Sequence, residues 1–449
     1  MTERIFIANR GEIAVRIIEA CDRLGFETVL GVSSADRQTL GARRATRTVV
    51  IGGPRPTDSY LNADAVLQAA ISTGCTALHP GYGFLSENPD FATKCAENGI
   101  VFIGPSPEAL RALGDKLTAR ALAESVGVPV SAGGTATSAA EVHELAESIG
   151  YPVLVKAAHG GGGRGMKLVE SAADLEEAWS LASSEAESAF GNGTVFLERF
   201  VTDAKHVEVQ ILGDRHGNRI HLGERECSVQ FRYQKVVEEA PCAALPEETR
   251  TLLHASALKI AVALDYVGLG TVEFLYDVDR DELAFLEVNP RVQVEHPVTE
   301  AVTGVDLVRE QILATLGHPL EITQDDVLLA GHAIECRITA QDPDKALAPS
   351  PGRVTRWRPS VAGGTRLDTH IYEGYLFPPY YDALMGKQIV WAADRDSAIK
   401  RMEGVLETFL IEGLKTSLPL LRRIMAHPDY RSNAVTTHWL NHELAQEVR

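Results

Sequence analysis

The sequence has no excess of basic residues. It contains 43 Lys and Arg against 61 Asp and Glu, which gives a formal net charge of -18 at pH 7. Nucleic acids and anionic membranes are bound through basic surfaces. The charge therefore argues against a nucleic-acid or membrane partner, and any anion that the protein binds must be held by a local cationic site.

Signals for export, membrane insertion and metal or disulfide frameworks are also missing. No run approaches the roughly 18 apolar residues of a membrane-spanning helix, and the opening stretch MTERIFIANRGEIAVRIIEACDRLG lacks the three regions of a signal peptide. The six cysteines form no C-x-x-C pair; they are Cys21, Cys75, Cys95, Cys227, Cys242 and Cys336. Their scatter indicates neither a zinc site nor a disulfide framework, and we expect a reduced, cytoplasmic protein.

Familiar nucleotide-binding signatures are absent. No Gly-Lys-Ser/Thr closes the glycine run, which excludes a P-loop, and neither H-R-D nor D-F-G occurs, which excludes a protein kinase. ANRGEI follows the first predicted strand, where a dinucleotide-binding fold has G-x-G-x-x-G. A nicotinamide cofactor is therefore disfavoured.

The sequence is long enough for about three domains, since it has 449 residues and 45% of them are hydrophobic. RIFIA (4–8) predicts a strand, the spacing of Ile13, Ile17, Ala20 and Leu24 predicts a helix, and TVLGV (28–32) predicts a second strand. Further units of this kind continue to residue 112. We expect residues 1–112 to form an open, mostly parallel sheet with helices on its faces.

A second region begins at residue 113. GDKLTARALAESVGVPV predicts a helix that ends before Pro129. YPVLVKAA and MKLV predict two short strands on either side of the glycine-rich loop 160–165, followed by a helix over 172–186. The glycines then join a hairpin, which favours a lid over a flexible connector. Lys156 and Arg164 beside the backbone N–H groups would favour an anion.

The most informative stretch is GTVEFLYDVDRDELAFLEVNPRVQVEH, residues 270–296. Two apolar strands flank the turn DVDRDE, and a register symmetric about Arg280 places Glu273 directly opposite Glu287. Asn289 shares their face because strand side chains alternate. Two carboxylates and an amide oxygen are the hard ligands that magnesium takes. A solvated edge strand is the alternative, but LAFLEV is too apolar on both faces for an edge.

The same alternation, continued past Asn289, puts Arg291, Gln293 and Glu295 on the polar face and Val288, Pro290, Val292 and Val294 on the other. We expect this strand to present one entirely polar face.

Motifs along the chain resemble the biotin carboxylase family, a branch of the ATP-grasp enzymes, from about residue 3 to about 440. The most specific are HPGYGFLSEN and NPRVQVEHPVTE; the others are IANRGEIA, GYPVLVKAAHGGGGRGM, HVEVQ, QKVVEEAP, VEFLY and AIECRI. The resemblance implies an α/β fold, α+β in its C-terminal part. It implies a Rossmann-like domain (1–112), an ATP-grasp domain (113–315) and a C-terminal biotin carboxylase domain (330–440).

The resemblance also implies roles for individual residues. For ATP, they are Lys116, Lys156, Gly161, Gly162, Gly163, Glu198, Arg199, His206, Gln230 and Tyr233. The metal ligands are Glu273, Glu287 and Asn289. The bicarbonate and biotin pocket comprises Tyr82, Lys235, Arg291, Gln293, Val294 (through its backbone), Glu295 and Arg337. Within it, Glu295 is the implied general base and Arg337 stabilises the biotin enolate.

The resemblance implies carboxylation of biotin by bicarbonate through carboxyphosphate, with ATP and two divalent cations, Mg²⁺ or Mn²⁺. Biotin would be supplied by a biotin carboxyl carrier protein, because GMKL (165–168) sits in the lid and not in a separate β domain. Separate carboxyltransferase subunits and a homodimer are also implied.

The sequence departs from the family pattern at two positions, and other roles for single residues and for the whole chain stay open. Phe231 and Tyr233 stand where the family commonly has arginine and histidine, which affects nucleotide affinity or the carrier served. Lys116 and His206 could be ordinary structural residues, and Arg337 could pair with Glu335 or another buried acid. The chain could be another ATP-grasp ligase that joins a carboxylate to an amine, or a non-catalytic nucleotide-binding module.

Overall fold

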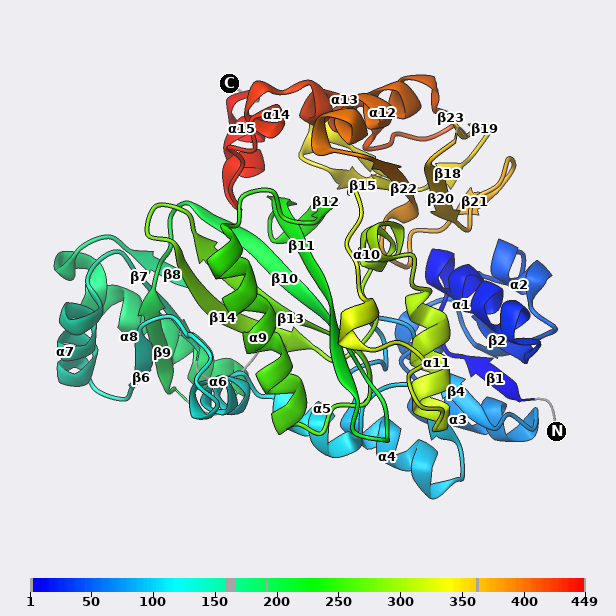
Figure 1. Ribbon diagram of the computed structural model, residues 1–449, viewed down its shortest axis with the longest axis horizontal. Coiled ribbons are helices and arrows are strands. Elements are labelled where there is room, and N and C mark those ends of the chain that lie inside the picture. The colour runs from blue at the N-terminus through cyan, green and yellow to red at the C-terminus, as the bar shows by residue number, and fades with distance from the viewer. Residues whose placement is uncertain (1–2, 158–165, 191–192, 361–362, 448–449) are drawn as a thin grey trace.

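The structure, a computed structural model, describes residues 3–157, 166–190, 193–360 and 363–447 (Figure 1). Its N-terminal part is a five-stranded parallel sheet in the order β3-β2-β1-β4-β5, which confirms the predicted open sheet. The strands are β1 (Arg4–Ile7), β2 (Glu27–Ser33), β3 (Arg47–Gly52), β4 (Ala77–His79) and β5 (Val101–Phe102). The helices are α1 (Gly11–Leu24), α2 (Leu40–Arg44), α3 (Ala63–Ser72), α4 (Pro89–Glu97) and α5 (Pro107–Gly114).

Both faces of this sheet are buried, which explains its continuous apolar strands. Ile5 and Ile7 pack in a cluster with α1, whereas Phe6 packs in a second cluster on the other face. The predicted helix buries Ile13 and Ile17 and ends at Gly25, whose φ of 70° is the left-handed conformation that glycine adopts freely. Open parallel sheets bind ligands at the carboxyl ends of their strands.

The lid region contains a four-stranded sheet in the order β6-β9-β7-β8. Its elements are β6 (Gly133–Ala136), α7 (Ala139–Ile149), β7 (Val153–Ala157), β8 (Lys167–Val169), α8 (Ala172–Phe190) and β9 (Val195–Arg199). β7 and β8 pair antiparallel, as the two predicted short strands require. Gly161, Gly162 and Gly163 lie outside the described residues.

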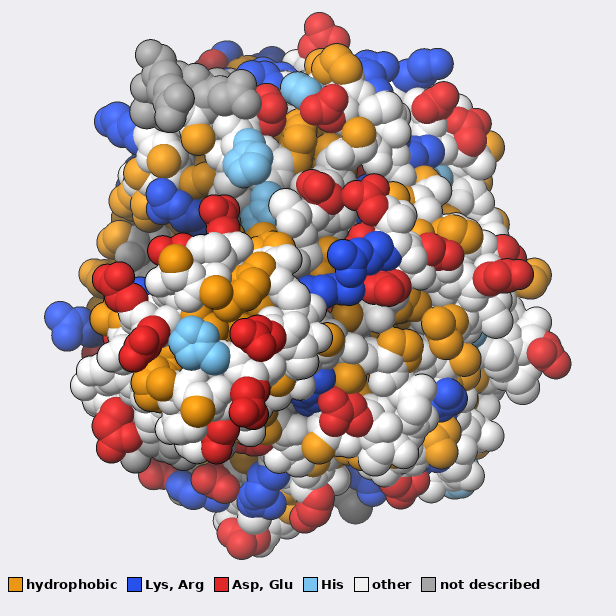
Figure 2. Space-filling view, turned by 90° about the vertical axis from the view of Figure 1, so that its left-hand side faces the viewer, with side chains coloured by type: hydrophobic (Ala, Val, Ile, Leu, Met, Phe, Trp, Pro, Cys, Tyr) orange, Lys and Arg blue, Asp and Glu red, His pale blue; other side chains and the backbone are white. Residues whose placement is uncertain are grey.

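The outer helices of the lid, α7 and α8, contain acidic residues but no Lys or Arg. Figure 2 looks onto this side of the molecule, where acidic side chains are spread over the surface. This surface repels phosphate, whereas Lys156 on β7 lines a cavity on the lid strands.

The central sheet has eight strands in the order β14-β13-β10-β11-β12-β15-β22-β20. The strands are β10 (Ala204–Gly213), β11 (Arg219–Phe231), β12 (Gln234–Ala240), β13 (Gly268–Asp277), β14 (Glu282–Asn289), β15 (His332–Thr339), β20 (Thr365–Thr369) and β22 (Leu384–Ala392). The accompanying helices are α6 (Lys116–Ser125), α9 (Glu247–Ala263), α10 (His296–Thr303) and α11 (Leu307–Leu316). One sheet thus extends from the predicted metal hairpin to β15, the strand of Arg337.

The expectation that LAFLEV would not be an edge strand was wrong, because β14 is the last strand of this sheet. Its apolar residues are nevertheless covered. The N–H of Phe285 donates to the carbonyl of Pro129 (2.7 Å), Val130 forms a parallel bridge with Phe285, and α5, α6 and α9 contact the strand. A loop and helices take the place of a further strand.

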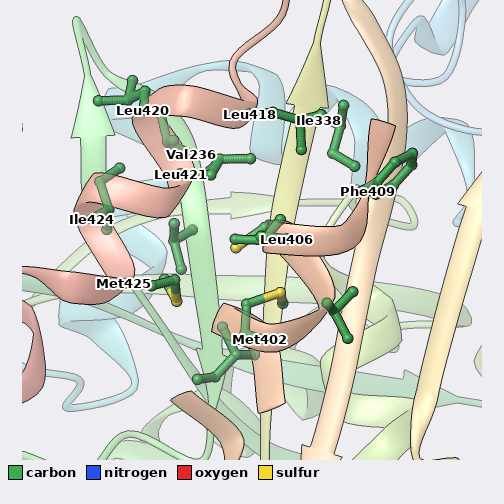
Figure 3. Close-up of a cluster of buried hydrophobic side chains, with 14 of the residues drawn as sticks. Val236, Ile338, Met402, Leu406, Phe409, Leu418, Leu420, Leu421, Ile424 and Met425 are labelled. Carbon is green, nitrogen blue, oxygen red and sulfur yellow. The ribbon is translucent and has the colours of Figure 1, made fainter. Parts of the chain in front are cut away.

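In the C-terminal part, at the top of Figure 1, α12 (Arg395–Thr408) packs onto β15 and β22, and α13 (Leu418–Ala426) onto β15. α14 (Pro428–Arg431) packs against α13, and α15 (Trp439–Glu447) against β11. Short strand pairs complete it: β16 (Gln341–Asp342) with β17 (Ala348–Pro349), β18 (Gly352–Arg353) with β21 (Leu376–Phe377), and β19 (Arg356–Arg358) with β23 (Leu410–Glu412). Met402, Leu406, Leu421 and Met425 fill the core against Ile338 of β15 (Figure 3). No helix among the described residues is long and apolar enough to span a bilayer.

Candidate active site

A cavity of about 1440 Å³ opens between the N-terminal loops, the lid strands, the central sheet and the C-terminal loops. Every predicted site residue that the structure describes lines it: Tyr82, Lys116, Lys156, Glu198, Arg199, His206, Gln230, Tyr233, Lys235, Glu273, Glu287, Asn289, Arg291, Gln293, Val294, Glu295 and Arg337. Residues from both ends of the chain therefore meet at one site.

The hairpin β13–β14 places Glu273 directly opposite Glu287, as predicted. The predicted register symmetric about Arg280 is wrong nearer the turn, where the pairs are offset by one residue. Leu286 is an extra residue, a β-bulge between the two parts of the ladder. Without this bulge Glu287 would point to the opposite face, because a one-residue slip reverses every side chain.

The oxygens of Glu273 are surrounded by donors. The amides of Asn289 (2.9 Å) and Gln293 (2.8 Å) and the Nζ of Lys235 (3.0 Å) all donate to its Oε1. His206 Nε2 lies 3.2 Å from its Oε2. Although burial raises the pKa of Glu273, Lys235 and His206 bring it well below its usual range.

This donor set fits a divalent cation. Glu273 and Glu287 are carboxylates on adjacent strands, and Asn289 adds an amide oxygen on the same face. Magnesium and manganese prefer such ligands. The cation would replace the positive charge that Lys235 supplies to Glu273.

Two lysines predicted to bind phosphates face the same cavity, each paired with an acid. Lys116, the first residue of α6, lies 3.2 Å from Glu287, and Lys156 on β7 donates to Glu198 at 2.8 Å. Both lysines are partly exposed, so incoming phosphate oxygens can compete for them.

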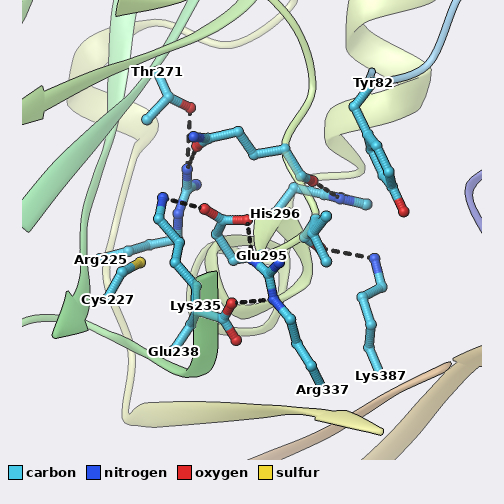
Figure 4. Close-up of polar contacts among 12 residues, drawn as sticks. Tyr82, Arg225, Cys227, Lys235, Glu238, Thr271, Glu295, His296, Arg337 and Lys387 are labelled. Atoms are coloured by element: carbon cyan, nitrogen blue, oxygen red, sulfur yellow. Dashed lines mark hydrogen bonds and ion pairs between the residues drawn. The ribbon is translucent and has the colours of Figure 1, made fainter. Parts of the chain in front are cut away.

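Lys235 is the centre of the buried charges. Its Nζ donates to Glu208 (2.5 Å), Glu273 (3.0 Å) and Glu295 (2.6 Å). Arg337 donates to the other oxygen of Glu295 at 2.9 Å. In Figure 4 these contacts form a continuous row from Lys235 through Glu295 to Arg337.

The charge state of Glu295 follows from these neighbours. Burial raises the pKa of this carboxyl, but Lys235 and Arg337 outweigh that effect and bring it below the usual value. Glu295 is therefore ionised and able to accept a proton. Arg337 does not pair with Glu335, the partner considered from the sequence; its partners are Glu295 and Glu238.

The predicted strand through residue 295 was wrong: β14 ends at Asn289, and residues 290–295 form a loop before α10. Pro290 has no N–H to continue the ladder. The alternation nevertheless persists, because Val292 enters the N-terminal core while Gln293 and Glu295 face the cavity.

Contacts at each end of this loop hold it in place. Arg291 Nε donates to Glu87 at 2.5 Å and its Nη2 to Asn289 at 2.9 Å. The carbonyl of Val294 accepts a hydrogen bond from Lys387 at 2.7 Å. The loop is thus tied to the N-terminal and the C-terminal parts of the chain.

Further residues expected to contact the nucleotide also line the cavity. Gln230 donates to the carbonyl of Cys227 (2.8 Å), and Arg199 lies 2.9 Å from Glu282. Tyr233 is 69% exposed at the tip of the β11–β12 hairpin, where its φ is 65°. Its side chain lines the cavity.

Tyr82 follows β4, where Asn9 donates to the carbonyls of Pro80 and Tyr82 (2.7 Å each). The Tyr82 hydroxyl donates to Glu12, and Lys387 lies 3.2 Å from the other oxygen of Glu12. Glu12 and Lys387 are buried neighbours of the site that the sequence reasoning missed.

Arg225 and Glu208 were also missed. Arg225 is fully buried and donates to Glu208 (2.7 Å), Thr271 (3.0 Å) and Gln293 (2.7 Å). It fixes the loop that holds Glu295 to the central sheet. Glu208 could have been found in HVEVQ, where alternation places it on the face of His206.

Comparison with known proteins identifies the family in which this fold and this set of site residues occur together. Residues 1–110 match the biotin carboxylase N-terminal domain, residues 115–323 the ATP-binding domain of the carbamoyl-phosphate synthase L chain, and residues 335–442 the biotin carboxylase C-terminal domain. The chain is 48% identical over 440 residues to a biotin carboxylase of Nostoc sp., covering 98% of each chain. It is 45% identical over 450 residues to that of Pseudomonas aeruginosa, covering 100% of each.

Solved structures of similar fold belong to the same family. The complex of Campylobacter jejuni biotin carboxylase with β,γ-ATP has a TM-score of 0.93 at 44% identity, covering 98% of this chain and 99% of that one. The biotin carboxylase domain dimer of Hydrogenobacter thermophilus 2-oxoglutarate carboxylase, with MgADP, ADP and bicarbonate, has a TM-score of 0.92 at 43% identity, covering 99% and 98%. In fold and in sequence along its whole length, the chain belongs to the biotin carboxylase family.

Proposed function

We propose that this protein is a ligase that carboxylates biotin with bicarbonate at the expense of ATP, the first half-reaction of an acyl-CoA carboxylase of the acetyl-CoA type. The observation that supports it most is the position of Glu295. This carboxylate is buried between Lys235 and Arg337 and adjoins the two-carboxylate hairpin. A base, a cation for phosphate and a cation for an enolate thus lie within one cluster.

The first step uses the base. Glu295 takes the proton of bicarbonate, whose oxygen then attacks the γ-phosphorus of ATP while ADP leaves. Lys116, Lys156 and Lys235 bind phosphate oxygens, and Arg291 and Gln293 orient the bicarbonate. Phosphate draws Lys235 away from its carboxylates, which raises the pKa of Glu295 and makes it a stronger base.

A divalent cation, Mg²⁺ or Mn²⁺, would be held by Glu273, Glu287 and Asn289, and when bound it neutralises charge on the transferring phosphoryl group. The family resemblance implies two such ions. The residues around the nucleotide base, Glu198, Arg199, His206, Gln230 and Tyr233, are proposed to bind ATP on the same grounds, with Gly161, Gly162 and Gly163 closing over the phosphates.

The second step uses the arginine. Carboxyphosphate decomposes to CO₂ and phosphate, the phosphate takes the N1′ proton of biotin, and N1′ attacks CO₂. Arg337 stabilises the charge that develops on the ureido oxygen, and Tyr82 lines the same pocket. A biotin carboxyl carrier protein supplies the biotin, and a carboxyltransferase consumes the carboxybiotin.

The division of the chain follows the same proposal. We assign residues 1–112 to a Rossmann-like domain, residues 113–315 to an ATP-grasp domain with its lid at about 130–200, and residues 330–440 to the C-terminal domain. A homodimer is proposed because the related 2-oxoglutarate carboxylase domain is described as a dimer.

Substrate dependence tests the proposal. With magnesium and ATP, phosphate release should require bicarbonate, and free biotin should accelerate it. Equal rates with and without biotin would favour the other ATP-grasp ligase function. Absence of bicarbonate-dependent hydrolysis together with retained ATP binding would favour the non-catalytic module.

A further inference from the structure

Two neighbouring strands place an unassigned acid beside the arginine of the site. β12 pairs antiparallel with β15, and Glu238 lies directly opposite Glu335. Arg337 is two residues further along β15, so it lies diagonally across from Glu238 on the same face. The intervening Cys336 points into the C-terminal core.

Glu238 and Glu295 hold different parts of the Arg337 guanidinium. Glu238 accepts from Nε, and Glu295 accepts from Nη2 at 2.9 Å (Figure 4). Glu238 is fully buried, and among the described residues Arg337 is the side chain that bonds it; its second oxygen has no hydrogen-bond partner. The Glu238 carboxylate thus interacts with Arg337 and with no other described side chain through a hydrogen bond.

The two acids differ in what the reaction does to them. Glu295 accepts a proton from bicarbonate before biotin is carboxylated, and its attraction for Arg337 then weakens. Directly opposite Arg337 on β22 lies a second buried cation, Lys387, which repels it. Burial and the charge of Glu295 raise the pKa of Glu238, although Arg337 opposes this. Once Glu295 is neutral its repulsion is gone, and Glu238 is the anion left in contact with the guanidinium.

We propose, on the basis of the function proposed above, that Glu238 is a positioning residue for the carboxylation step. It holds Arg337 at the biotin ureido oxygen after Glu295 has taken up its proton. A bond at Nε leaves the Nη groups facing the cavity, where they can donate to the oxygen of biotin.

The test is Glu238→Gln, which keeps the shape of the side chain and removes its charge. Phosphate and carboxybiotin are measured in the same reaction. Bicarbonate-dependent phosphate release should stay close to wild type, while carboxybiotin per phosphate should fall roughly 10- to 100-fold, the effect of losing a charge-assisted hydrogen bond. A purely structural role would lower both products together.

Glu239→Gln is the matched control. Glu239 is the next residue of the same strand, is also buried and ion-paired, but bonds His332 (2.7 Å) and Arg395 (2.8 Å) away from the cavity. Its product ratio should equal that of the wild type. In an Arg337→Ala background, Glu238→Gln should cause no further change in the ratio.

An unchanged ratio in Glu238→Gln, or a further loss in the Arg337→Ala background, would overturn the inference. If the glutamine variant melts below the assay temperature, Glu238→Asp gives the second measurement, because its charge is kept but retracted by one methylene; a wild-type ratio there would also count against the inference. The wild-type reaction reports on the proposed function separately, since biotin carboxylation must occur there first.

Discussion

Replacing Lys235 by methionine would remove a buried cation while keeping a side chain of similar length. Its Nζ lies 2.5, 3.0 and 2.6 Å from carboxylate oxygens of Glu208, Glu273 and Glu295. All three acids are buried. Removing one partner of a buried ion pair costs about 3–5 kcal/mol, and we expect Lys235→Met to lower the free energy of unfolding by about that amount at neutral pH.

The loss should depend on pH in a defined direction. In the wild type, the pKa values of Glu273 and Glu295 are lowered, so their stabilisation is present above their unfolded pKa of about 4.3 and is lost on further acidification. Without Lys235 their folded pKa values rise above the unfolded value. Protonation then relieves the repulsion, and the difference from wild type should shrink between pH 8 and about pH 5.

Urea denaturation at pH 8 and pH 5.5, with a chelator or with magnesium, measures these effects. Magnesium should restore part of the lost stability, because a cation at Glu273 replaces the missing charge. Lys205→Met is the control: Lys205 is a buried lysine paired with Glu226 at 2.7 Å, and magnesium should not rescue its loss. An equal loss at both pH values and no rescue by magnesium would refute the electrostatic account of this site.

Three further outcomes are expected. Glu287→Gln should raise the magnesium concentration for half-maximal ATP turnover by at least roughly 10-fold. The melting temperature should not fall, because the substitution relieves repulsion with Glu273. A collapsed melting temperature with normal magnesium dependence would show the metal assignment to be wrong. Tyr233→His should change the KM for ATP by less than roughly 10-fold, since the side chain is exposed, and complete inactivation would reveal another role. Burial lowers the pKa of His79 to about 3. The neutral histidine therefore stabilises the fold fully above its unfolded pKa of about 6.5, and the free energy of unfolding falls by about 2 kcal/mol on acidification to pH 5. In denaturation experiments His79→Asn should lose correspondingly less stability between these pH values, and an unchanged pH dependence would contradict this.

Local pattern was enough to predict much of the site. Alternation placed Glu273, Glu287 and Asn289 on one face, and turn residues marked the hairpin. The bulge at Leu286 was not predictable, since no glycine marks it. The end of the strand was predictable from Pro290, whose missing N–H the sequence reasoning did not weigh.

The unpredicted residues depend on contacts between distant strands. Glu238 and Arg225 each have charged neighbours on their own strands, Glu239 on β12 and Glu224 and Glu226 on β11. The sequence alone does not show which of these charges faces a buried partner. Lys387 lies 93 residues from the carbonyl of Val294 that it bonds. Only the order of strands in the central sheet brings these groups into contact with residues that line one cavity.

The central claim is that an oxygen of bicarbonate attacks the γ-phosphorus of ATP at Glu295. Bicarbonate uniformly labelled with ¹⁸O, supplied with ATP, magnesium and biotin, tests it directly when the phosphate product is analysed by mass spectrometry early in the reaction. The account predicts that each phosphate contains one ¹⁸O atom, in step with carboxybiotin formation. Phosphate whose new oxygen comes from water, while carboxybiotin still forms, would contradict it.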